Sequence, residues 1–392
     1  MSLETCYRYH FPDGTTKNIH IRGKTKTELA EKRAKLRQQE RDGIDLATSS
    51  KFGVWADRWL NNVVLDKGLR KATEVQYRSS VNHLKRRFEN TEFRYISLNS
   101  FQVFLNDLAV ENPNTGKPAS KSTLIHIRNA ARAIALNADG SHCPGETSFY
   151  KCVIPRDAPT KTRYAISEEQ VKRIQEFQHP AQPIAMTLTF SGLRRGECLA
   201  LQWRNIDLDN GTIRVEQEIV FDTGDDNTPR LVPGGKTKNA VRTVAIPPVL
   251  VDFLKRYRKS FEVFPAPAQI VFPDRSGRHY TKSEFRRLWD NYMFALNRQY
   301  GDFSNVDISK KKDRDLPRKI EFFTTHQARH FFATLCFLEG LTVGESMQQL
   351  GHGDPTVTLG RYADLENYYK PELSDDFRKK LSTDYKISLS VS

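Results

Sequence analysis

The chain has few cysteines, and their arrangement fits neither disulfide bonding nor metal binding. Its 392 residues contain five cysteines, which are scattered and include no Cys-x-x-Cys pair. An odd number of widely spaced thiols argues against a disulfide framework and against a zinc module. We therefore expect reduced thiols, as in an intracellular protein.

Long apolar runs and nucleotide-binding motifs are also missing. No stretch approaches the ~20 apolar residues that a membrane-spanning helix needs. The opening MSLETCYRYH lacks the apolar core of a signal peptide. No GxxxxGK[ST] loop and no Rossmann glycine pattern occurs. The sequence predicts a cytoplasmic protein with no membrane contact and no cofactor.

Positive charge, by contrast, is in excess. The chain has 61 Lys and Arg against 47 Asp and Glu, for a formal net charge of +14. Such a balance favours a polyanionic partner, with nucleic acid as the first candidate, although charge can also serve solubility alone. The length predicts two or three domains, each with its own core.

Residues 1–46 are predicted to form a small β-β-α module. Alternating residues on both sides of the turn FPDG predict a hairpin over 5–22. The charged segment that follows predicts a helix, with Thr25 and Glu28 as a capping box and Leu29 and Leu36 as its few large apolar residues. The module is either a DNA-contacting appendage or simply carries a solvated charged helix.

Residues 50–140 predict a helical domain. Four amphipathic patterns lie between 52 and 138, and a Gly- and Pro-rich stretch at 141–164 indicates an interdomain linker. Basic residues on the expected outer surfaces could hold phosphates or form an ordinary solvated face. They are Lys67, Arg70, Lys71, Arg78, Lys85, Arg86 and Arg87.

Residues 165–392 predict a larger domain that is mainly α-helical and carries a small sheet. A helix is expected to start at Ser167 and another to run over 185–202. Short strands are expected within 210–221 and 238–247, with a loop at 222–236 between them. The predicted fold is thus multidomain, mainly α with small antiparallel sheets.

Two histidines in HQARH suggest a metal site, but the pattern is incomplete. His326 and His330 are spaced as in the zinc motif HExxH. Gln327 replaces the glutamate that would act as the base, and no clear third ligand follows. We expect no metal, and we expect His330 to serve in packing or in support of the site.

The same segment suits phosphate chemistry without a metal. Arginine pairs well with a phosphodiester because its planar fork donates two aligned hydrogen bonds and stays charged. Arg329 shares a helical face with His326, and Arg194 precedes Glu197 by three residues, so Glu197 can orient it. The run that starts at His326 ends at Tyr362, whose phenol could serve as a nucleophile. The phenol of tyrosine has a pKa of about 10, so neighbouring cations must help to ionise it.

Taken in order, these segments resemble the tyrosine recombinase, or phage integrase, family. The matching pieces are SGLRRGECLALQW, GGKTKNAVRTVAIP, TTHQARHFFATL and LGHGDPTVTLGRY. The helical region is similar to the family's core-DNA-binding domain. The N-terminal module resembles the arm-binding modules of integrases from conjugative transposons and temperate phages.

The resemblance implies a role for each matching residue. Tyr362 would attack DNA phosphorus, Arg194 and Arg329 would clamp the phosphate, and Glu197 would support Arg194. His326 would act as general acid or base and His352 would support the phosphate or leaving group. Lys236 would protonate the departing 5′-oxygen, with Lys238 as the competing lysine. Arg195, Tyr368 and Tyr369 do not fit the motif spacing.

The resemblance further implies double-stranded DNA with core and arm-type sites, a homotetramer and a Holliday junction. A DNA-bending host factor and an excision factor are expected helpers. The tail after Tyr362 would either dock on a neighbouring protomer or fray. Two alternatives remain: a non-catalytic architectural DNA-binding protein, and an enzyme of the type IB topoisomerase kind.

Overall fold

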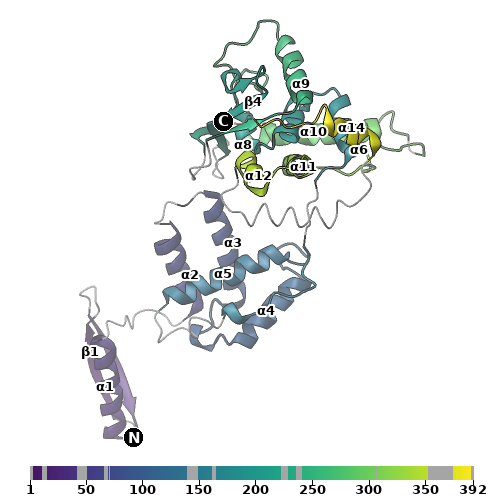
Figure 1. The fold of residues 1–392 in the computed structure, drawn as a ribbon. Helices are drawn as coiled ribbons and strands as arrows, with labels where there is room; N and C mark the ends of the chain where they lie inside the picture. The colour runs from purple at the N-terminus through teal and green to yellow at the C-terminus, as the bar shows by residue number, and fades with distance from the viewer. Residues whose placement is uncertain are drawn as a thin grey trace. The chain divides into compact units, whose positions relative to one another are not determined.

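The computed structural model divides into two compact units, Met1–Lys161 and Thr162–Ser392, each of which is described by itself (Figure 1). Both are mainly helical with small antiparallel sheets, which confirms the predicted fold class. No helix in the described part of the chain is long and apolar enough to span a membrane. The structure describes residues 3–10, 16–41, 51–65, 69, 71–138, 149–160, 165–221, 228–234, 241–305, 307–351 and 374–389.

The N-terminal segment folds into the hairpin and helix that its pattern predicts. Tyr7, Tyr9 and Ile21 face one side of the ribbon and are buried, and Leu29 and Leu36 of the helix pack against them. Such a small core agrees with a module appended to the helical unit. The elements are β1 (Leu3–His10), β2 (Thr16–Gly23) and α1 (Lys26–Arg41).

The capping of α1 differs in one detail from the predicted capping box. The amide of Glu28 donates to the Thr25 hydroxyl at 3.1 Å, as expected. The Glu28 carboxylate, however, accepts from the amide of Lys24 at 2.8 Å. Glu28 therefore satisfies an amide one residue before the predicted one.

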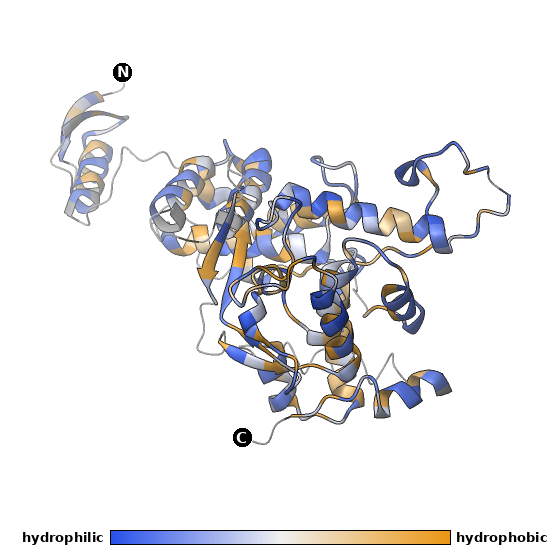
Figure 2. Ribbon diagram, turned by 90° about the horizontal axis from the view of Figure 1, so that it is seen from above, coloured by the Kyte–Doolittle hydropathy of each residue, from blue (hydrophilic) through white to orange (hydrophobic). Residues whose placement is uncertain are grey.

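The four predicted helices of the middle region are confirmed. Their apolar faces enclose a core rich in phenylalanine, and Figure 2 shows hydrophobic and hydrophilic residues sharing single helices, as amphipathic packing requires. The elements are α2 (Phe52–Trp59), the π-helical turn η1 (Leu60–Leu65), α3 (Lys71–Phe88), η2 (Phe93–Tyr95), α4 (Leu98–Val110), α5 (Lys121–Asn137) and η3 (Phe149–Lys151).

Part of the predicted linker belongs to this helical core. The ring of Phe149 stacks on Phe93 at 6.1 Å between centroids and lies 4.7 Å from the ring of Phe101. Cys152 and Ala158 are also buried there. The packed unit thus extends into residues 149–160, because apolar side chains are set among the glycines and prolines that indicated a linker.

The second unit, Thr162–Ser392, contains the helices and strands of the second half of the chain. Its helix α6 begins at the predicted position, where Ser167 caps it in a complete capping box with Gln170. The elements are α6 (Glu168–Glu176), α7 (Gln182–Ser191), α8 (Arg195–Leu199), η4 (Trp203–Asn205), β3 (Ile206–Asp207), β4 (Thr212–Val215), β5 (Gln217–Phe221), β6 (Pro229–Pro233), β7 (Arg242–Ala245), α9 (Pro248–Lys259), α10 (Lys282–Tyr300), η6 (Asp313–Asp315), α11 (Thr325–Leu338), α12 (Val343–Leu350) and α14 (Asp375–Ser382).

The prediction of one helix over 185–202 is wrong. The chain leaves the helix at Gly192, whose φ of 61° lies in the left-handed region that favours glycine. Helix α7 ends there, and Arg194 becomes the N-cap of the short helix α8. This break puts the Arg194 side chain on a turn between two helices.

The expected loop at 222–236 contains a strand. Strand β6 pairs antiparallel with β5, with Gln217 opposite Pro233 and Phe221 opposite Pro229. A second sheet has the order β3-β4-β7. The prolines at both ends of β6 resemble loop residues in the sequence, and this explains why the strand was not predicted.

The described part of the C-terminal tail packs on its own unit. Phe377 of α14 and the following Tyr385 and Ile387 belong to the unit's hydrophobic core. The Tyr385 hydroxyl also donates to the side chain of Gln175 on α6 at 3.3 Å. Residues 374–389 are therefore packed against their own unit and not frayed.

Candidate active site

A single buried carboxylate, that of Glu197, gathers the basic residues of the site. It accepts hydrogen bonds from the amide and Nη1 of Arg194, both at 2.8 Å. Arg242 of β7 donates to both carboxylate oxygens, at 3.0 and 2.8 Å. Nη1 of Arg329, on α11, lies 3.9 Å from Oε2. The predicted support of Arg194 by Glu197 is present in the structure, and Glu197 also joins the other two arginines.

This setting keeps Glu197 ionised. Burial by itself would raise the pKa of the carboxyl group, but the hydrogen bonds and charge of Arg242, with the charges of Arg329 and Arg194, lower it to about 2. Three guanidinium groups thus surround one carboxylate, and these four side chains leave two positive charges uncompensated. A surplus of positive charge around a fixed carboxylate is suited to binding a phosphodiester.

The same three arginines also bind the end of α12. Three successive carbonyls, those of Gln349, Leu350 and Gly351, accept from Arg242, Arg329 and Arg194 respectively. The last carbonyls of a helix have no partner within the helix, so these contacts satisfy groups that would otherwise need water. The three arginines therefore hold the turn that directly precedes His352.

The position of Gly351 favours glycine for two reasons. Its φ of 65° is left-handed, as at many helix ends. A Cβ atom there would lie 2.8 Å from Nη1 of Arg242. The guanidinium group of Arg242 thus packs directly against the backbone of the turn, which explains a glycine in LGH.

The three arginines differ in exposure. The side chain of Arg194 is 43% exposed, whereas those of Arg329 and Arg242 are 4% and 3% exposed. Arg329 also donates to the carbonyl of Gly192. Burial and the neighbouring charge of Arg194 lower the pKa of Arg329. The structure brings together the two arginines that were predicted to bind the phosphate. The side chain of Arg194 is accessible to a ligand, whereas that of Arg329 is buried and donates its hydrogen bonds to backbone carbonyls.

His326 lies in the first turn of α11 with an exposed side chain. Its ring centroid is 4.2 Å from that of His330, with the rings inclined at 65°. Gln327 completes a capping box with Thr324. The glutamine that replaces the glutamate of HExxH therefore caps the first turn of α11. Within the described residues, no group of three His, Cys, Asp or Glu side chains could hold a metal ion.

Three predicted site residues fall outside the described residues. These are Lys236, His352 and Tyr362, and Lys238 falls outside them too. Their roles stay predictions.

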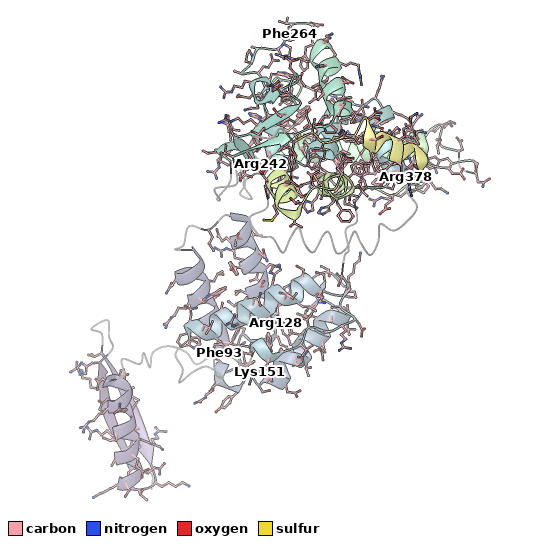
Figure 3. All side chains as sticks on the ribbon, viewed as in Figure 1. Phe93, Arg128, Lys151, Arg242, Phe264 and Arg378 are labelled. Carbon is pink, nitrogen blue, oxygen red and sulfur yellow. The ribbon has the colours of Figure 1, made fainter. Side chains whose placement is uncertain are left out.

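One residue of the cluster, Arg242, was not predicted (Figure 3). It lies in the quoted motif KTKNAVRTVAIP and shares the buried face of β7 with Val244. Buried and exposed residues alternate from Arg242 to Val244, and Arg242 occupies a position on the buried side. A buried cation needs an anionic partner, so this alternation in the sequence could have indicated the role of Arg242.

Comparisons with known proteins give the family of the chain. The sequence profile of the phage integrase family matches residues 165–368. The chain belongs to the phage integrase family and is a tyrosine recombinase. The resemblance read from the four sequence motifs is thereby confirmed, as are the fold and the class of enzyme.

Relatives of known class cover much of the chain. A tyrosine recombinase XerC-like protein of Caldanaerobacter subterraneus subsp. tengcongensis is 25% identical over 356 residues, covering 87% of this chain and 86% of that protein. The ICEBs1 integrase of Bacillus subtilis is 29% identical over 188 residues, covering 47% of this chain and 45% of that protein.

Solved structures show the same fold. The integrase of the transposon Tn1549, in complex with a circular intermediate DNA, aligns with a TM-score of 0.60 and 17% identity. The alignment covers 84% of this chain and 98% of the solved chain.

Proposed function

We propose that this recombinase cuts and rejoins DNA at specific sites of a mobile element, through a 3′-phosphotyrosyl bond to Tyr362 and a Holliday junction. The observation that carries the proposal is the cluster of Arg194, Arg242 and Arg329 around Glu197. It presents one exposed fork, that of Arg194, from a rigid positive frame. The similarity to the integrase of the transposon Tn1549 and to the ICEBs1 integrase supports the mobile-element part.

In the proposed reaction, the phenolic oxygen of Tyr362 attacks phosphorus and the bond to the 5′-oxygen breaks. Negative charge grows on the nonbridging oxygens, where the Arg194 fork and the charge of Arg329 stabilise it. His326 takes up the tyrosine proton, His352 supports the phosphate, and Lys236 gives a proton to the leaving 5′-oxygen. The phosphotyrosyl bond keeps the energy of the broken bond, so a partner strand's 5′-hydroxyl reverses the step without metal or ATP.

DNA binding by the helical unit is supported by a groove of about 620 Å³ along α3. Its lining is mainly basic and polar, with one acid, Glu89, which pairs with Lys85 at 3.4 Å. The other lining residues are Val75, Arg78, Ser79, Asn82, Arg86 and Asn114. Basic and amide side chains of this kind bind the phosphates of a duplex. We place the core DNA site along this face of α3.

The N-terminal ribbon offers a second polar surface, the face of β1 and β2 that points away from α1. Its exposed residues include Arg8, Asn18 and Arg22, and Glu4 is the one acid, paired with Arg22 at 3.2 Å. A two-stranded ribbon fits the major groove of DNA. Residues 1–46 thus suit an arm-type site, with residues 50–140 on the core site and 165–392 as the catalytic domain. A homotetramer on DNA, with a bending factor and an excision factor, completes the proposal.

The test is a covalent trap. Wild-type protein is mixed with a pool of nicked, randomised duplexes, from which the short 5′ fragment diffuses away after cleavage. Denatured protein–DNA adducts are then recovered and sequenced. We expect adducts from wild type and from Tyr368→Phe, the matched control, and none from Tyr362→Phe.

Two results would contradict the proposal in different ways. An adduct from Tyr362→Phe would remove Tyr362 as the nucleophile. A wild-type protein that binds the duplexes but forms no adduct, even on the recovered binding sequences joined to the ends of the element, would mark a non-catalytic DNA-binding protein.

A further inference from the structure

We propose that Arg242 is a positioning residue for the cleavage step, acting through Glu197 and the last turn of α12 on Arg194. The inference rests on the proposed function, because it concerns the rate of the same DNA cleavage.

Arg242 cannot act on DNA directly. Its side chain is 3% exposed. Nε donates to the carbonyl of Gln349 at 3.0 Å, and Nη1 and Nη2 donate to the two oxygens of Glu197. All three guanidinium nitrogens are thus engaged with protein groups, so any influence on the reaction passes through those groups.

The contacts of Arg242 join three elements that are distant in the sequence. Its own strand is β7, which follows Lys236 in the sequence. Glu197 is on α8, and Gln349 is in the last turn of α12. The Gln349 side chain makes a second hydrogen bond to β7, since its Oε1 accepts from the amide of Ala245 at 2.8 Å. Strand β7 and the end of α12 are therefore fixed to each other by two links.

Arg194 depends on both groups that Arg242 holds. Nη1 of Arg194 donates to Glu197, and Nη2 donates to the carbonyl of Gly351. With Arg242 removed, Glu197 would lose the hydrogen bonds of 3.0 and 2.8 Å that hold both of its oxygens, and the α12 turn would lose one of three anchors. The Arg194 fork would then no longer be fixed where the phosphate must lie. Misplacing a catalytic group by about 1 Å can cost ~10²-fold in rate.

A purely structural role for Arg242 is the competing explanation, because breaking a buried ion pair destabilises a fold. The two roles differ in one measurable respect. A positioning residue that acts through Arg194 loses its effect when Arg194 is already impaired, whereas a structural residue keeps it. Val244 offers a matched control, since it is buried on the same face of β7.

The experiment measures single-turnover cleavage of a nicked duplex at saturating DNA, with DNA affinity and the thermal unfolding midpoint recorded for each variant. The variants are Arg242→Lys, Arg194→Lys, their double mutant and Val244→Ala. We expect Arg242→Lys to lower the cleavage rate by ~10²-fold with DNA affinity within about twofold of wild type. The double mutant should cleave no slower than Arg194→Lys. Val244→Ala should lower the midpoint and cleave at nearly the wild-type rate.

Additive losses in the double mutant, or cleavage by Arg242→Lys at the Val244→Ala rate, would overturn the inference. If Arg242→Lys does not fold, Gln349→Ala replaces it, because it breaks the other link between α12 and β7 and leaves the ion pair in place. Cleavage at the wild-type rate by Gln349→Ala would then overturn the inference. Failure of the wild type itself to cleave would instead reject the proposed function.

Discussion

Gly192 and Phe332 approach so closely that a Cβ atom on Gly192 would lie 2.4 Å from Cδ1 of the phenylalanine ring. Gly192 ends α7 in the left-handed region, and its carbonyl accepts a hydrogen bond from Arg329. The position therefore combines a backbone conformation, a tight packing contact and a link to the arginine cluster.

The first prediction follows from this contact. We expect Gly192→Ala to lower the free energy of unfolding by about 2–5 kcal/mol, since left-handed backbone costs ~1–2 kcal/mol and overpacking adds ~1–3 kcal/mol. Gly277→Ala is the matched control, because Gly277 has a φ of 78° and nothing within 4 Å of its added Cβ. Urea unfolding of both variants measures the difference. Equal losses would show that Phe332 yields to the methyl group.

The second prediction concerns Glu197 and acid. Its pKa in the folded protein is about 2, against an ordinary value of 4.5. A depressed pKa stabilises the fold above pH 4.5, and this contribution disappears as the pH falls from 4.5 toward 2. At ~1.4 kcal/mol per pKa unit, about 3 kcal/mol is involved.

Glu197→Gln removes this titration while keeping the side-chain shape. We expect the free energy of unfolding of wild type to fall about 3 kcal/mol further than that of Glu197→Gln between pH 5 and pH 2. Chemical denaturation across that range is the measurement. Parallel curves for the two proteins would show that Glu197 does not carry the depressed pKa.

The third prediction separates two adjacent arginines. Arg194→Ala should lower DNA cleavage by ~10²–10³-fold, the usual cost of one transition-state donor. Arg195 lies over the rings of Phe221 and Phe285, at 4.8 and 5.5 Å from their centroids. Arg195→Ala should therefore lower the thermal midpoint and leave cleavage nearly unchanged. Slow cleavage by a folded Arg195→Ala protein would contradict this assignment.

Local patterns explain why much of the site could be predicted from the sequence. Arg194 and Glu197 are three residues apart, and so are His326 and Arg329. This spacing alone predicts that the two members of each pair lie close together. Helix starts such as Ser167 also depend on residues that are close in sequence.

The features that were not predicted depend on distant residues. The break at Gly192 depends on packing against Phe332, and the role of Arg242 depends on partners 45 and 107 residues away. A propensity-based reading extends a helix through GLRRGE because it contains no information on those contacts. Strand β6 was missed for a similar reason, since its pairing with β5 outweighs its prolines.

The last prediction tests the DNA face of α3. Arg86 lines the α3 groove, and Arg94, in the same helical unit, does not. Neutralising a phosphate-binding arginine should reduce the salt dependence of binding, with a change of about 0.9 in the slope of log affinity against log salt. We therefore expect Arg86→Gln to flatten this slope by about 0.9 and to weaken binding to all duplex sequences alike. Arg94→Gln carries the same charge change and should leave the slope as in wild type. Equal slopes for both variants would place the core DNA site elsewhere on the helical unit.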